Sequence, residues 1–146
     1  MRLLNFVKEA GSKVVGKNNE EQAESIKNTI VKAIPEADNI KLKLDEGKLT
    51  IDGEVKNMEI CEKIITIAGN HEGIAKVENN IKIEGLDIAE DKIKLYTVVK
   101  GDTLGGIAKK VYGDSSKYKQ IFEFNQPMLK NPDLIYPGQV LRMPEL

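Results

Sequence analysis

Apolar residues recur every three or four positions in three segments of the N-terminal half, which is the spacing of an amphipathic helix. The first segment is residues 1–12, with Gly11 where a helix-terminating glycine would stand. The second runs from about Glu20 to Ala33 and is followed by Pro35, and the third runs from Met58 to about Ala68. We therefore predict a short N-terminal helix and two longer helices.

Strict alternation of apolar and polar residues marks the strands between these helices. Residues 40–44 and 49–51 alternate on either side of the turn Asp45-Glu46-Gly47, which predicts a β-hairpin. A glycine-bracketed loop over residues 69–74 then leads to an alternating run over residues 77–83. After the N-terminal helix, the predicted order is helix, strand, strand, helix, strand.

The C-terminal third has a different order of elements. A β-branched strand over residues 96–99 precedes a Gly-Asp turn, in which we expect Asp102 to cap the helix that begins near Leu104. A second helical run ends before Asn125, and a Pro-Gly turn introduces a last strand over residues 140–143. The order β-α-α-β and the turns resemble a LysM domain.

Residues 20–84 resemble a BON domain, through the hairpin that ends in Ile51-Asp52-Gly53-Glu54-Val55 and the return from Gly73 to Ile81. The expected fold class is therefore α+β, with an N-terminal helix at residues 1–12, a BON domain at 20–84 and a LysM domain at 94–146. Together with the opening Asn5 to Gly11, this combination is similar to the small cytoplasmic potassium-binding proteins of bacteria. The resemblance implies that the chain binds K⁺, becomes more compact on binding, and acts as a sensor or buffer of the ion.

Composition agrees with a small globular binding protein. Of the 146 residues, 40% are hydrophobic and 31% are charged, and the formal net charge is −1, which offers no argument for nucleic acid. The halves differ in sign, since residues 1–90 contain 13 Lys or Arg against 17 Asp or Glu, and residues 91–146 contain 9 against 6. Two oppositely charged domains would attract one another, although both imbalances are also compatible with ordinary solubilising surface. The N-terminal apolar run is too short for a secretory signal, so we expect a cytoplasmic monomer, with an unidentified protein partner left open.

Catalytic chemistry is not expected. His71 is the single histidine and lies in a glycine-rich loop without a neighbouring serine or second cysteine, so we expect it to be a solvent-exposed loop residue. Cys61 falls at helical spacing with Ile64 and Ile65, which predicts a buried thiol. We predict a binding protein and not an enzyme.

The family resemblance implies a K⁺ site built from backbone carbonyl oxygens, which side-chain motifs do not reveal. Unpaired carbonyls are expected at the end of the N-terminal helix and in the loop over residues 69–74. The candidate ligands are Val7, Ala10, Gly69, His71 and Ile74. A simpler interpretation, in which the glycines of these segments only terminate helices, stays open.

Two other functions compete with ion binding. Many LysM domains bind glycans that contain N-acetylglucosamine, as in peptidoglycan, and resemblance places such a groove on two loops. Its residues would be Gly101, Asp102, Thr103, Leu104 and Gly105 in the first loop, and Asn131, Pro132, Asp133, Leu134 and Ile135 in the second. Position 105 is glycine where the family usually has serine. The N-terminal helix would alternatively lie on a membrane surface, but its short length favours packing against the protein.

Overall fold

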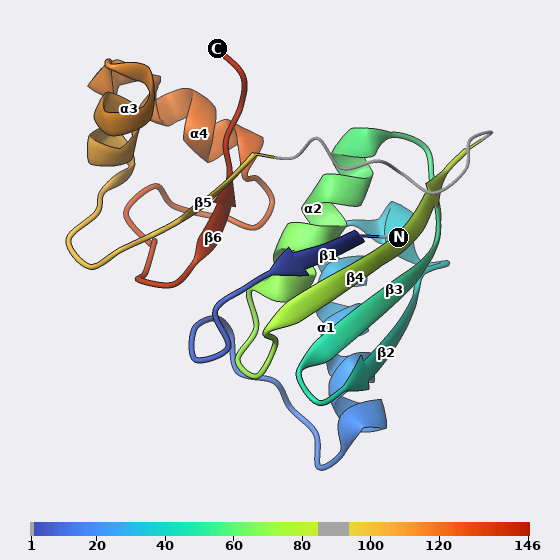
Figure 1. Ribbon diagram of the computed structural model, residues 1–146. Coiled ribbons are helices and arrows are strands. Elements are labelled where there is room, and N and C mark those ends of the chain that lie inside the picture. The colour runs from blue at the N-terminus through green and yellow to red at the C-terminus, as the bar shows by residue number, and fades with distance from the viewer. Residues whose placement is uncertain (1, 85–93) are drawn as a thin grey trace.

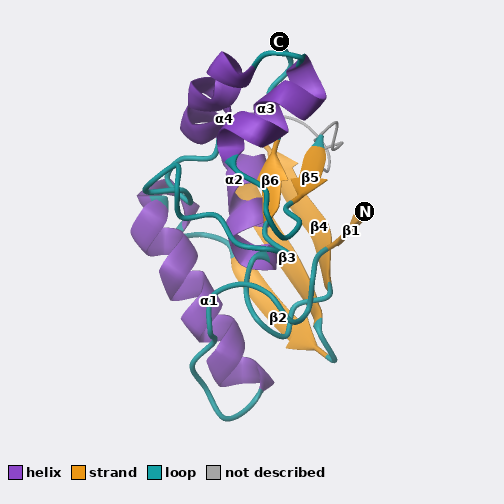
Figure 2. Ribbon diagram, turned by 90° about the vertical axis from the view of Figure 1, so that its left-hand side faces the viewer, coloured by secondary structure: helices purple, strands orange, loops and turns teal. Residues whose placement is uncertain are grey.

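Two helices cover one face of a four-stranded sheet in the N-terminal half of the protein, as Figures 1 and 2 show. The computed structural model describes residues 2–84 and 94–146, so the predicted linker from Glu84 to Lys94 lies almost wholly outside the described residues. The strand order in the sheet is β1-β4-β3-β2. The strands are β1 (Arg2–Asn5), β2 (Lys41–Asp45), β3 (Lys48–Val55) and β4 (Lys76–Ile83).

The two helices of this half begin at asparagine caps. The side chain of Asn18 accepts the N–H of Glu21 at the start of α1 (Asn19–Ala33), and that of Asn57 accepts the N–H of Ile60 at the start of α2 (Met58–Gly69). A short 3-10 turn, η1 (Pro35–Ala37), follows α1 directly. Both helices and the hairpin after α1 confirm the predicted order of elements.

The hairpin and the crossover arrange the sheet. Glu46 and Gly47 both have positive φ, 46° and 79°, which is the geometry of the tight turn that joins β2 to β3. Because α2 connects them, β3 and β4 run parallel, whereas β1 is antiparallel to β4 on its other side. The return of the chain through α2 thus places β4 in the middle of the sheet.

The predicted N-terminal helix is wrong, because residues 2–5 form the edge strand β1 (Figure 1). Leu4 and Phe6 are buried while Leu3 is about half exposed, which is the alternation of a strand. An isolated helix of some ten residues is marginal in water, whereas the open edge of β4 offers a complete ladder of hydrogen bonds. Gly11 is therefore not a helix cap. The chain from residue 6 to residue 12 is a loop, named here the N-terminal loop.

The C-terminal half forms the predicted β-α-α-β unit. Its elements are β5 (Leu95–Thr97), α3 (Leu104–Tyr112), the 3-10 turn η2 (Ser115–Lys117), α4 (Tyr118–Phe124) and β6 (Val140–Arg142), with β5 and β6 antiparallel. Asp102 does not cap α3 as predicted. Thr103 does, by accepting the N–H of Gly106, while the Asp102 carboxylate accepts from the N–H of Val99 and the hydroxyl of Tyr96.

Each half has its own apolar core. The larger core lies between the sheet and helices α1 and α2, and it includes Cys61, which is fully buried as predicted. The smaller core lies between α3, α4 and the β5–β6 ribbon. Val140 of β6 belongs to the larger core although it follows the LysM pattern in sequence, so the two halves share a packed contact.

Candidate functional site

The loop that follows α2, residues 70–75, is held against the N-terminal loop by backbone hydrogen bonds. The N–H of Phe6 donates to Ala75 O (2.9 Å), and the N–H of Gly73 donates to Lys8 O (2.7 Å). At the other end, the N–H of Ser12 donates to Asn70 O (3.0 Å). We call residues 70–75 the α2–β4 loop. The two loops, some sixty residues apart in sequence, therefore lie side by side as one layer of backbone.

Gly11 permits the closest approach between these loops. It has φ of +109°, and a Cβ at this position would lie 2.5 Å from both the carbonyl carbon and the carbonyl oxygen of Asn70. Both the dihedral angle and the lack of space require glycine here. Gly11 therefore allows the two loops to meet, whereas the sequence pattern had predicted that it ends a helix.

The predicted ligand carbonyls divide into two kinds. That of Val7 accepts the N–H of Ala10, and that of His71 accepts the N–H of Ile74. Across the described ranges 2–84 and 94–146, outside the regular helices and strands, no backbone N–H donates to the carbonyls of Ala10, Gly69 or Ile74. A carbonyl oxygen has two lone pairs, so even those that accept one hydrogen bond can take a further partner.

Carboxylates do not cluster at this place. Among the described residues, no three His, Cys, Asp or Glu side chains come together where they could hold a metal ion. The hydrogen bonds between the two loops bring main-chain carbonyl oxygens into one region. Neutral carbonyl oxygens suit a large monovalent cation, which they coordinate in place of its water shell.

His71 is buried, with 4% of its surface exposed, so the prediction of an exposed loop histidine is wrong. Its Nδ1 lies 3.1 Å from the carbonyl oxygen of Ala68, which fixes the ring against the end of α2. Burial lowers the pKa of the imidazole, and hydrogen bonds to the carbonyls of Ala68 and Ile67 oppose this effect. The neutral imidazole of His71 thus anchors the loop. Only the main-chain carbonyl of His71 is a candidate ligand.

The β6 strand of the C-terminal half packs beside both loops. A Cβ on Gly138 would lie 2.6 Å from that of Ala10 and 3.2 Å from Cγ1 of Val7, so the turn before β6 rests on the N-terminal loop. Asn70, 6% exposed, uses its side-chain amide to donate to Val140 O (2.9 Å) and to accept the N–H of Val140 (2.8 Å). The candidate ion loops are therefore also the contact surface of the second domain.

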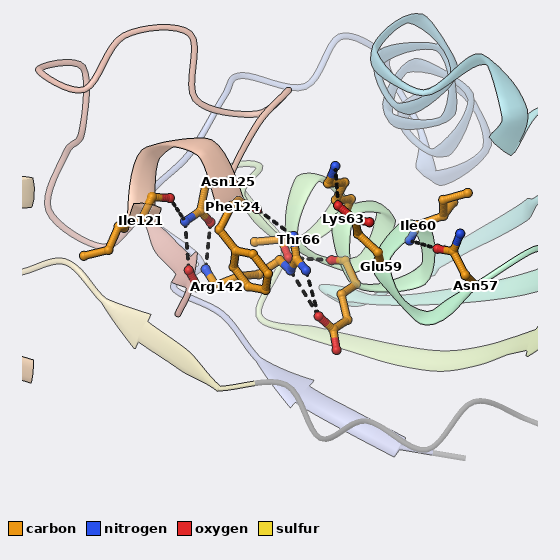
Figure 3. A network of polar contacts seen from close by, with 10 residues as sticks. Asn57, Glu59, Ile60, Lys63, Thr66, Ile121, Phe124, Asn125 and Arg142 are labelled. Atoms are coloured by element: carbon orange, nitrogen blue, oxygen red, sulfur yellow. Dashed lines mark hydrogen bonds and ion pairs between the residues drawn. The ribbon is translucent and has the colours of Figure 1, made fainter. Parts of the chain in front are cut away.

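An ion pair between the buried Arg142 and the partly buried Glu62 completes this contact (Figure 3). Arg142, 2% exposed, donates to Oε1 of Glu62 on α2 at 2.8 Å and to the carbonyl of Phe124 at 2.7 Å, and its guanidinium lies 3.9 Å from the centre of the Phe124 ring. The pair joins the acidic half to the basic half. Figures 1 and 2 both show β6 running beside α2.

Sequence reasoning missed Asn70, Glu62, Arg142 and Gly138. No local pattern marks Asn70, Glu62 or Gly138, because Asn70, for example, reads as an ordinary helix end. A buried arginine within an otherwise apolar strand, Val-Leu-Arg-Met, was the one available signal for a buried ion pair.

The predicted glycan-binding residues lie on two separate loops. In the first, Gly101 has φ of +92°, Leu104 is buried and Thr103 caps α3. In the second, the side chain of Asn131 accepts the N–H of Asp133, and Leu134 is 66% exposed. Within the described part of the chain, no backbone hydrogen bond links the two loops, but Leu104 of the first and Ile135 of the second both pack in the smaller core. Glycan binding stays a prediction.

No helix among the described residues has both the length and the apolar composition needed to cross a membrane.

Comparison with known proteins agrees with the two-part architecture. The BON domain family matches residues 18–85, and the LysM domain family matches residues 96–144. The chain is 44% identical over 151 aligned positions to the potassium binding protein Kbp of Escherichia coli O6:H1 strain CFT073, with 99% of each chain covered.

Two further relatives match only part of the chain. An uncharacterized protein of Deinococcus radiodurans is 46% identical over 63 residues, which are 40% of this chain and 24% of the relative. The uncharacterized protein YqbP of Bacillus subtilis is 43% identical over 61 residues, 36% of this chain and 28% of the relative. Because the likeness to Kbp extends from end to end, this chain belongs to the Kbp family, in which a BON domain is followed by a LysM domain.

Proposed function

We propose that this protein binds K⁺ between the N-terminal loop and the α2–β4 loop, and that it acts as a cytoplasmic sensor or buffer of the ion. The proposed ligands are the main-chain carbonyl oxygens of Val7, Ala10, Gly69, His71 and Ile74. The observation that carries the proposal is the pairing of these two loops in a chain similar throughout to a potassium binding protein. Three of the proposed carbonyls, those of Ala10, Gly69 and Ile74, accept no N–H from the described backbone outside the regular helices and strands.

The chemistry of the region fits a monovalent cation. K⁺ is large and singly charged, so several neutral oxygens compensate for its lost hydration, whereas Ca²⁺ prefers carboxylates. Because the ligands belong to the N-terminal loop and, far away in sequence, to the end of α2 and the loop that follows it, they are brought together only in the folded chain. Binding should therefore stabilise the fold, by about 2.7 kcal/mol when the free ion exceeds its Kd a hundredfold.

The domain contact supports a response to the ion. Because Gly138 and Asn70 connect the same two loops to β6, an ion that orders the loops also favours the docked position of the LysM domain. A compact K⁺-bound monomer and a looser ion-free form would follow. A docked surface of this kind would then be available for recognition by a further protein. The proposed role is one of binding, without catalysis.

Backbone ligands can be tested directly by NMR. Titration of ¹³C-labelled protein with KCl should shift the carbonyl resonances of the five proposed ligands, with choline chloride as the control for ionic strength. Thermal unfolding in the same series should show a higher midpoint with K⁺ than with Na⁺. Equal stabilisation by Na⁺, or shifts confined to surface carboxylates, would contradict a selective carbonyl site.

A further inference from the structure

Strand β6 has one edge that no other described strand covers, and two asparagine side chains occupy that edge. The carbonyl of Gln139 accepts the N–H of Val98, and the N–H of Met143 donates to Lys94 O, so these alternate residues hydrogen-bond on the β5 side. The N–H and C=O groups of Val140 and Arg142 point the opposite way, because successive residues of a strand alternate in direction. An uncovered strand edge presents unpaired polar groups. The amides of Asn70 and Asn125 satisfy these groups as a neighbouring strand would.

The two asparagines have almost the same geometry. Asn125 accepts the N–H of Arg142 at 2.8 Å and donates to its carbonyl at 2.8 Å, and it also donates to the carbonyl of Ile121 four residues earlier. Asn70 accepts the N–H of Val140 at 2.8 Å and donates to its carbonyl at 2.9 Å, and it also donates to Thr66, again four residues earlier. One difference is that Nδ2 of Asn70 also donates to Sδ of Met128 at 3.3 Å. The other is that Asn125 belongs to the LysM domain, whereas Asn70 belongs to the BON domain.

The backbone of Asn70 is also held by hydrogen bonds. Its N–H donates to Thr66 O at the end of α2, its carbonyl accepts the N–H of Ser12, and its neighbours Gly69 and His71 are proposed ligands. Any change in the course of the two loops therefore changes the direction in which the Asn70 amide points. Because this side chain is buried, water does not readily replace the bonds that it makes to Val140.

We infer that Asn70 is the positioning residue that couples the ion site to the LysM domain: ordering of the loops aims its amide at the edge of β6 and so favours docking. This inference rests on the proposed function. The ion pair between Glu62, on a different turn of α2, and Arg142 of β6 also strengthens docking, and it is expected to act equally with and without the ion. Coupling between two sites is reciprocal, so docking should raise K⁺ affinity by the same factor by which K⁺ favours docking.

Amide hydrogen exchange in the unmodified full chain tests this coupling, because β6 contains its own control. At matched ionic strength, KCl in place of choline chloride should slow exchange of the Val140 N–H about tenfold, within the range of roughly 5- to 150-fold for coupled sites. Exchange of the Arg142 N–H, which Asn125 holds within the LysM domain, should stay nearly constant. Unchanged Val140 exchange despite measured K⁺ binding, or equal slowing at both positions, would overturn the inference.

Two variants give a second measurement by small-angle scattering and K⁺ titration. In Asn70→Ala, the radius of gyration should no longer depend on K⁺, and K⁺ affinity should fall about tenfold, within the same range for coupled sites. In Glu62→Ala, docking should weaken at every K⁺ concentration but should still respond to the ion. A full K⁺ response of Asn70→Ala refutes the coupling alone. Absence of K⁺ binding by the unmodified chain refutes the proposed function and the coupling with it.

Discussion

Substitution of Gly11 by alanine tests whether the close approach of the two loops creates the ion site. The new Cβ would lie 2.5 Å from backbone atoms of Asn70, which cannot rotate away as a side-chain tip does. We expect the N-terminal loop to separate from the α2–β4 loop. This variant is a sharper test than removal of residues 1–12, because that deletion would also remove β1 and two residues of the larger core, Leu4 and Phe6.

The size of the effect follows from two contributions. Non-glycine residues at such positive φ cost on the order of 1–3 kcal/mol. Separation of the loops next to Gly11 also breaks the two hydrogen bonds of the adjacent Ser12, from its N–H to Asn70 O and from the N–H of Glu72 to its carbonyl, each worth about 0.5–1.5 kcal/mol. Together, the free energy of unfolding should fall by about 2–6 kcal/mol.

Gly101→Ala is the matched control for this experiment. Gly101 has a similar φ of +92° and lies in the LysM half, and a Cβ added to it would meet no other atom within 4 Å. The free energy of unfolding of Gly101→Ala should therefore fall only by the cost of backbone strain, about 1–3 kcal/mol. Urea unfolding measures both losses, and thermal unfolding with KCl against choline chloride measures the ion response. If Gly11→Ala loses no more stability than Gly101→Ala and keeps its K⁺ response, the loop pairing does not form the site.

Single substitutions also test the domain contact and the buried histidine. Glu62→Ala should lower the free energy of unfolding by about 3–5 kcal/mol, because Arg142 would stay buried without its partner. On the same helix, Glu59→Ala removes only the surface pair with Lys63 and should change the free energy of unfolding by less than about 0.5 kcal/mol. Similar losses in Glu62→Ala and Glu59→Ala would argue against burial of the Glu62–Arg142 pair. Because burial lowers the pKa of His71 below 6.5, the unfolded chain binds more protons than the folded one, so stability should be full above pH 6.5 and decline as pH falls below it. In His71→Gln, the free energy of unfolding, measured by urea denaturation at each pH from 7 to about 5, should decline less as pH falls. An unaltered dependence of this free energy on pH would exclude His71 as its source.

From α1 onward, the order of elements was determined by local sequence alone. Alternation on either side of Asp45-Glu46-Gly47 predicted the β2–β3 hairpin, and Gly47 suits the positive φ of its turn. The helical period from Met58 to Ala68 predicted α2 and the burial of Cys61. Such patterns are local because a helix or a hairpin is closed by hydrogen bonds between near neighbours.

Tertiary structure decided the N-terminal segment and the burial of polar side chains. Leu3, Leu4, Phe6 and Val7 fit either a helical or an alternating pattern, and the free edge of β4, seventy residues later, selected the strand. His71 and Asn70 read as surface residues until α2, the N-terminal loop and β6 enclosed them. Whether a polar group is exposed or satisfied inside the protein depends on partners distant in sequence, so no local pattern could have predicted the surface on which the two domains meet.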